Sequence, residues 1–161
     1  MTQDLATPFL VRLDAVEQRL ALHARTVPGG VTEADKATGE RWECGQIWAH
    51  LAEFIPYWVT QAERVIAKNS ADPEPFGRVK ANQERIAAIE RERGTSISQL
   101  WQSVREDISD LRAFLTELPD HGWRLRGRHE TRGVLGMTQM IEEFLVGHLE
   151  EHADQLDTLQ D

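Results

Sequence analysis

Two histidines near the carboxyl end of the chain have a spacing that suits metal chemistry. The stretch GHLEEHADQL, residues 147–156, places His148 and His152 four residues apart. At roughly 100° per residue, such a pair falls on one face of an α-helix. That face also carries an apolar stripe, formed by Met137, Ile141, Phe144, Leu145, Leu156 and Leu159. The spacing therefore predicts two imidazoles that point into a helical core.

A third histidine, His50, has a similar setting in another segment. The same face of its expected helix carries Ile47, Phe54, Trp58 and Val65. An imidazole in an apolar core needs partners for both ring nitrogens, because an unpaired buried polar group costs about 1–3 kcal/mol. A shared divalent metal ion meets that need, since neutral imidazole is a good ligand for zinc, nickel, cobalt and iron. The candidate ligands are therefore His50, His148 and His152, and the alternative is three separately satisfied core residues.

A site with three protein ligands leaves at least one coordination position open. This is typical of a catalytic site more than of a closed structural one. Water in that position becomes a nucleophile near neutral pH, and a thiolate could take the same place. The residues alone therefore leave two reactions open, hydrolysis and the transfer of a low-molecular-weight thiol to a small electrophile.

Helical periodicity dominates the segments that must position these side chains, and the alternation typical of strands is nearly absent. The pattern predicts an all-α fold whose main helices cover residues 8–26, 44–68, 96–118 and 137 to near the end, with a short extra helix at 78–93. Pro56 lies inside the second of these, where we expect a kink and not two separate helices. Four principal helices with long connections favour a four-helix bundle that forms one domain over residues 1–161.

Composition excludes several classes of function. The formal net charge of −9 argues against sequence-independent nucleic-acid binding and against anionic membranes. The single cysteine, Cys44, has no partner for an internal disulfide, and the first residues lack the pattern of a signal peptide. No run of 18 apolar residues occurs, so no transmembrane helix is expected and the chain is predicted to be cytoplasmic.

Two stretches resemble a known family. GERWECGQIWAHLAEF (39–54) is similar to the second-helix signature of the DinB-like superfamily, which includes the YfiT-type metal-dependent hydrolases, and GMTQMIEEFLVGHLEEHADQLDTL (136–159) resembles its last helix. The resemblance implies an up-up-down-down four-helix bundle, often a homodimer. It also implies that His50, His148 and His152 hold zinc or nickel. Family members include bacillithiol and mycothiol S-transferases and a mycothiol-dependent maleylpyruvate isomerase, so a thiol cosubstrate is possible and the substrate is left open.

A second interpretation belongs to another class of protein. In it the chain is a non-catalytic metal-binding or purely structural dimeric bundle that acts in stress response through a partner. This interpretation predicts a closed or empty site and a large apolar surface patch. The apolar stripes are all needed for the core of the monomer, so the sequence indicates no spare face.

The segment PDHGWRLRGRHETRG (119–133) is expected to be a loop or a short extended arm. Its arginines, Arg124, Arg126, Arg128 and Arg132, form either a gate for an anionic substrate or a solvated loop, and charge runs favour the loop. We expect His121 and His129 in this arm to be exposed. His23, on the first helix, is left outside the site.

Other residues near the candidate site allow two roles each. Cys44 is either a nucleophile or, as we expect, a passive small residue. Aromatic side chains could line a pocket but are more often core: Trp42, Trp48, Phe54, Tyr57 and Trp58. One of Glu150, Glu151 and Asp154 could orient an imidazole or act as a base, although such residues usually face solvent.

Overall fold

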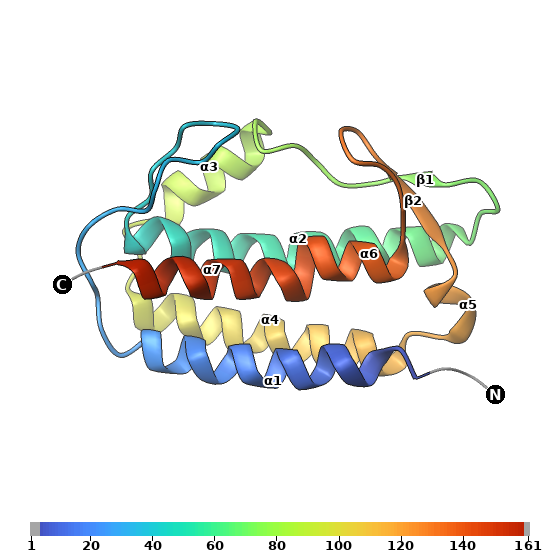
Figure 1. The fold of residues 1–161 in the computed structure, drawn as a ribbon, viewed down its shortest axis with the longest axis horizontal. Helices are drawn as coiled ribbons and strands as arrows, with labels where there is room; N and C mark the ends of the chain where they lie inside the picture. Colours follow the sequence, from blue (N-terminus) through green and yellow to red (C-terminus); the bar gives the residue numbers. More distant parts are fainter. Residues whose placement is uncertain (1–3, 160–161) are drawn as a thin grey trace.

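Four long helices frame the molecule in this computed structural model, which describes residues 4–159 (Figure 1). They are α1 (Ala6–His23), α2 (Cys44–Lys68), α4 (Ile97–Glu117) and a last helix made of α6 (Met137–Ile141), the π-helical η1 (Glu142–Val146) and α7 (Gly147–Thr158). The predicted four-helix bundle is confirmed.

The helix directions follow from the connections. α1 and α7 run one way and α2 and α4 run the other, so the order along the chain is up, down, down, up instead of up-up-down-down (Figure 1). The connection 24–43 joins two helix ends at the same end of the bundle. The connection 69–96 runs back along the bundle and carries α3 (Gln83–Glu92), so it is the long crossover.

The apolar stripes predicted for the helices are buried together in one core. In α1 these are Phe9, Leu13, Val16 and Leu20, and in α4 they include Leu100, Val104, Ile108, Leu111 and Leu115. α2 is one continuous helix through Pro56, as expected, and Pro56 is exposed. The hydroxyl of Ser96 caps α4 by accepting a hydrogen bond from the backbone N–H of Gln99 at 3.2 Å.

A small sheet, which the all-α prediction did not include, covers one side of the bundle. β2 (Arg126–His129) pairs antiparallel with β3 (Gly133–Gly136) and parallel with β1 (Glu74–Pro75), and the single turn α5 (Asp120–Trp123) precedes β2. Strands of two to four residues are too short to give a period-2 pattern. The predicted extended arm is therefore a hairpin.

Gly77 allows the segment after β1 to pass close to α2. Its φ is +83°, and a Cβ there would lie 2.7 Å from the Trp58 ring and 2.9 Å from the His129 ring. The crossover segment and the hairpin therefore lie directly against the helix that carries His50. Within residues 4–159, no helix combines the length and the apolar character needed to cross a bilayer.

Candidate metal centre

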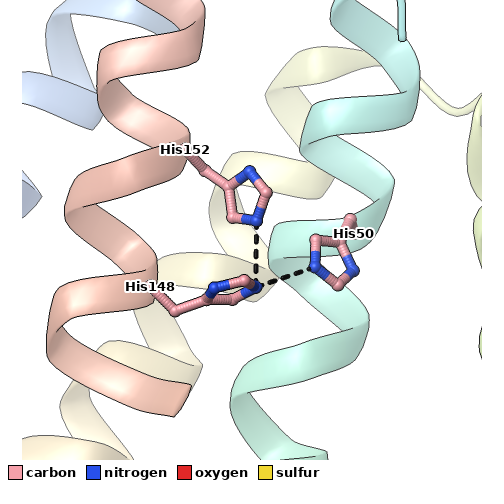
Figure 2. A group of neighbouring side chains, drawn as sticks. All are labelled: His50, His148 and His152. Carbon is pink, nitrogen blue, oxygen red and sulfur yellow. Dashed lines mark hydrogen bonds between the residues drawn. The ribbon is translucent and has the colours of Figure 1, made fainter. Parts of the chain in front are cut away.

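Three imidazoles meet between α2 and α7, as Figure 2 shows. The Nε2 atom of His148 lies 3.1 Å from Nε2 of His50 and 3.0 Å from Nε2 of His152. His50 and His152 are buried, whereas the side chain of His148 is 21% exposed. The structure thus brings together the three histidines that the sequence singles out, at the edge of the core.

The other ring nitrogen of each imidazole contacts an oxygen three residues further along the same helix. The Nδ1 distances are 2.7 Å for His50 with Glu53, 2.6 Å for His152 with Gln155 and 3.3 Å for His148 with Glu151. For His50 and His152 these oxygens accept hydrogen bonds, so Nδ1 of each ring carries the single proton of a neutral imidazole. The Nε2 atoms of His50 and His152 therefore present lone pairs toward Nε2 of His148, at the centre of the cluster.

This donor set fits a metal ion. Burial lowers the pKa of His50 and of His152 well below the ordinary value of 6.5, and the neighbouring imidazoles lower it further for both, so these two rings are neutral. Converging lone pairs repel one another unless a cation lies between them. Nitrogen ligands at 2.0–2.1 Å from one ion, in tetrahedral or octahedral geometry, lie about 2.8–3.4 Å apart. The observed separations of 3.0 and 3.1 Å agree with that range.

Aromatic rings enclose the cluster and hold the imidazoles in place. Trp42 stacks on His152 with ring centroids 6.1 Å apart and meets His50 edge-on at 5.1 Å. Phe54 lies 4.6 Å from the ring of His148. Both aromatic side chains are buried, so they limit the access of water to this side of the cluster.

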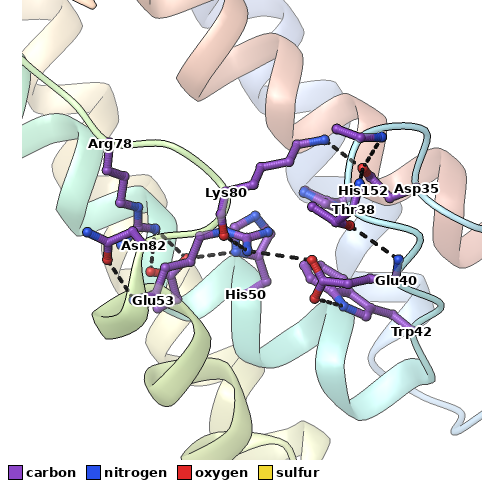
Figure 3. A network of polar contacts seen from close by, with 12 residues as sticks. Asp35, Thr38, Glu40, Trp42, His50, Glu53, Arg78, Lys80, Asn82 and His152 are labelled. Carbon is purple, nitrogen blue, oxygen red and sulfur yellow. Dashed lines mark hydrogen bonds and ion pairs between the residues drawn. The ribbon is translucent and has the colours of Figure 1, made fainter. Parts of the chain in front are cut away.

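A buried carboxylate fixes the orientation of His50. Arg78 donates to both oxygens of Glu53, at 2.5 and 2.7 Å, while the same carboxylate accepts from Nδ1 of His50 (Figure 3). Burial raises the pKa of Glu53, and the hydrogen bonds and charge of Arg78 oppose that rise. This carboxylate–histidine pair sets the tautomer and raises the basicity of the ring, as is common around protein-bound metals.

A cavity of about 440 Å³ opens onto His50 and His148. Its apolar wall includes Trp58 and Phe144, whose rings stack with centroids 4.1 Å apart. Its remaining side chains include the basic residues Arg78, Lys80, Arg85 and Arg132. Two of the three clustered histidines face this space, and a smaller cavity of about 100 Å³ reaches all three.

The last helix changes its winding just before the cluster. Residues Glu142–Val146 form a π-helical segment, and a Cβ on Gly147 would lie 2.1 Å from the carbonyl oxygen of Glu142. Only glycine fits this backbone approach. Such π-segments carry one extra residue per turn and often occur at functional sites. The local winding therefore sets the rotation of α7 and with it the aim of His148 and His152.

The histidines outside the cluster have different surroundings. His129, which we expected to be exposed, is only 4% exposed, because β2 packs it against Phe144 and its Nε2 bonds the carbonyl of Arg78 at 2.9 Å. The exposure prediction is correct for His121. His23 bonds Asp157 at 2.6 Å, away from the cluster.

The other candidate residues of the sequence analysis also differ in their distance from the cluster. The arm arginines Arg124, Arg126, Arg128 and Arg132 are all exposed, and of these only Arg132 lines the cavity at the three histidines. Glu150 pairs with Arg12, and Asp154 pairs with Arg19. Cys44 is buried, which raises the pKa of its thiol and agrees with a passive role. Trp48 and Phe54 are core residues.

Several residues that contact or surround the cluster were not predicted from the sequence. Glu53, Gln155, Arg78 and Arg85 were not singled out. A signal existed for the first two, because each candidate ligand has an oxygen-bearing side chain at i+3. Arg78 and Arg85 come from the crossover, and their positions depend on tertiary packing that a periodicity does not encode.

The chain is similar to known proteins in structure and not in sequence. No family model matches the chain, and no curated protein matches its sequence. YfiT from Bacillus subtilis, described as a probable metal-dependent hydrolase with an unusual four-helix bundle topology, matches with a TM-score of 0.72 at 13% identity over 98% of this chain and 86% of YfiT.

Two further solved structures are similar to this chain in fold. An uncharacterised protein from Clostridium difficile 630 matches with a TM-score of 0.65 at 11% identity, over 98% of this chain and 96% of its own. One from Escherichia coli UTI89 gives 0.63 at 11% identity, over 98% and 94%. The chain therefore has the YfiT-like four-helix bundle fold, and it contains a three-histidine cluster that could bind a metal ion.

Proposed function

We propose that this chain is a metal-dependent hydrolase, with one divalent ion, zinc or nickel, held by His50, His148 and His152. The observation that carries the proposal is the convergence of three Nε2 atoms, with Nδ1 of His50 and of His152 already bonded to Glu53 and Gln155. The likeness in fold to YfiT, described as a probable metal-dependent hydrolase, supports the same reading. The substrate is a small molecule that fits a cavity of about 440 Å³.

The protein's own groups have separable tasks in this proposal. The three imidazoles bind the ion, Glu53 and Arg78 hold His50 in its tautomer, and Trp42 and Phe54 keep water from the inner side. When bound, the ion supplies a Lewis acid with open coordination positions, which lowers the pKa of a water or thiol that coordinates there.

Transfer of a thiol uses the same three-histidine site as hydrolysis, and an activity assay distinguishes the two reactions. The zinc-loaded and nickel-loaded protein is assayed on a panel of small esters, amides and electrophiles, with water alone and with added glutathione, bacillithiol or mycothiol. Turnover without a thiol supports hydrolysis. A strict thiol requirement makes the protein a transferase, and metal binding without any turnover favours the non-catalytic bundle. The homodimer and the cytoplasmic location stay predictions.

A matched pair of variants shows whether any activity belongs to the site. His50→Ala removes a proposed ligand, whereas His23→Ala removes a histidine that bonds Asp157 on the other side of α7. Activity should be lost in the first variant and kept in the second. Equal activity in both would reject this cluster as the active centre.

A further inference from the structure

Basic side chains dominate the cavity that opens onto His50 and His148. Four of its lining residues are cationic and none is acidic, namely Arg78, Lys80, Arg85 and Arg132. The chain as a whole has a net charge of −9, so the charged side chains that line this cavity are opposite in sign to the net charge of the protein. Cationic side chains beside apolar walls attract an anionic ligand to the extent that no carboxylate of the protein already pairs with them.

Three of these cations are neutralised by their own carboxylates. The N···O distances are 2.5 Å for Arg78 with Glu53, 2.6 Å for Lys80 with Asp35 and 2.5 Å for Arg132 with Glu143. Figure 3 shows the first two of these contacts beside His50. Their charges already have partners within the protein, so they contribute little unbalanced charge to the cavity.

Arg85 differs from the other three. It is 6% exposed, and the nearest carboxylate oxygen among residues 4–159 belongs to Glu40, at 3.9 Å. The other oxygen of the Glu40 carboxylate accepts a hydrogen bond from the indole N–H of Trp42 at 3.2 Å (Figure 3). One guanidinium nitrogen of Arg85 donates to the carbonyl of Lys80 at 2.9 Å. Arg85 also lies over the Trp42 ring, 5.5 Å from its centroid. A guanidinium stays charged even when buried, and the distant Glu40 contact leaves its two-pronged face without a close anionic partner in the part of the chain that the structure describes.

The position of Arg85 places this charge beside the histidine cluster. Arg85 lines the large cavity together with His50 and His148, and it also lines a cavity of about 100 Å³ that reaches His152. Its backbone N–H donates to the side chain of Asn82, which caps α3, so the first turn of this helix is fixed. The bond from the guanidinium to the Lys80 carbonyl holds the other end of the side chain.

We propose that Arg85 binds the carboxylate, or a similar oxyanion, of a small organic acid whose flat apolar body lies against Trp58 and Phe144. The planar guanidinium suits bidentate binding of such a group, and the two stacked rings form an apolar wall of the same cavity. This inference rests on the proposed function, because it names the substrate class of that site. It assigns anion binding to a buried residue of α3, in place of the exposed arginines of the 119–133 arm.

The test uses two probes that differ in charge and match in shape, 4-fluorobenzoate and 4-fluorobenzamide. Their dissociation constants are measured by ¹⁹F NMR titration at pH 7.5, with metal-free and with zinc-loaded protein. Wild type is compared with Arg85→Gln, Arg85→Lys and the control Arg105→Gln, an exposed arginine that contacts Trp101 away from this cavity. We expect the benzoate to bind about tenfold or more tightly than the amide, and Arg85→Gln to remove that preference.

The outcomes separate this inference from the metal proposal. Benzoate preference in metal-free protein, lost in Arg85→Gln and kept in Arg105→Gln, supports the anion site even where the chain binds no zinc. Equal binding of benzoate and benzamide by wild type overturns it, and so does an unchanged preference in Arg85→Gln. Should Arg85→Gln not fold, the comparison of the two probes on wild type and on Arg85→Lys decides.

Discussion

Acid should destabilise the metal-free protein through the two buried histidines of the cluster. Burial lowers the pKa of His50 and His152 in the folded state well below 6.5, their value in an unfolded chain. Below pH 6.5 the unfolded chain therefore binds more protons than the folded one. The free energy of unfolding is thus highest above pH 6.5 and falls as the pH falls toward the folded-state pKa values.

The magnitude follows from linkage. Each histidine that is protonated only in the unfolded state changes stability by up to about 1.4 kcal/mol per pH unit. Between pH 7.5 and 5.5, His50 and His152 together remove up to about 2.7 kcal/mol, because neither folded-state ring takes up a proton as readily as the unfolded chain does. That is a large share of the roughly 5–15 kcal/mol by which such domains are stable.

The assay is urea denaturation of the metal-free protein at pH 7.5, 6.5 and 5.5, followed by tryptophan fluorescence. The comparison is the His50→Gln/His152→Gln variant, which keeps every other titrating group. Asp107, whose pKa burial and nearby acids raise to about 6, opposes the acid effect in both proteins and cancels in the difference. Parallel pH curves for the two proteins would refute the claim that these imidazoles are buried and neutral.

Three further predictions concern single residues. Glu53→Gln should weaken zinc affinity about 10- to 100-fold, because it loosens the orientation of His50. Competition with a chelator measures this affinity, and an unchanged value would mean that Glu53 does not position the His50 ring. Gly147→Ala should destabilise the protein by about 1–3 kcal/mol in urea denaturation, the opposite of the gain usual for this change in a helix, because its Cβ would meet the carbonyl of Glu142. Asp107→Asn should raise the Tm at pH 7.5 and change it little at pH 5, and an equal shift at both pH values would contradict the raised pKa.

The ligand set could be predicted because its pattern is local. His148 and His152 share a helix face, and both they and His50 follow apolar stripes that the bundle buries. The stripe of the last helix was incomplete, since Val146 and Leu149 are also buried whereas Phe144 and His148 lie at the cavity edge. A count of 100° per residue fails across a π-segment, whose residues advance by a smaller angle.

The surroundings of the cluster depend on contacts between distant segments. His129 is buried because the hairpin packs onto α2, and Arg85 reaches the cluster because α3 begins at Gln83, later than the expected residue 78. The backbone from 78 to 82 is therefore free to line the cavity with Arg78 and Lys80. Periodicity within one segment contains no information on such pairings.

Metal content tests the central claim most directly. Untagged wild-type protein and the His148→Ala/His152→Ala variant are purified side by side, and their divalent metals are counted by mass spectrometry. We predict about one ion per wild-type chain and almost none in the variant, with far-UV helicity kept in both. A wild-type protein that carries no divalent ion and also fails to bind added zinc or nickel would contradict the account and leave the three histidines as core residues.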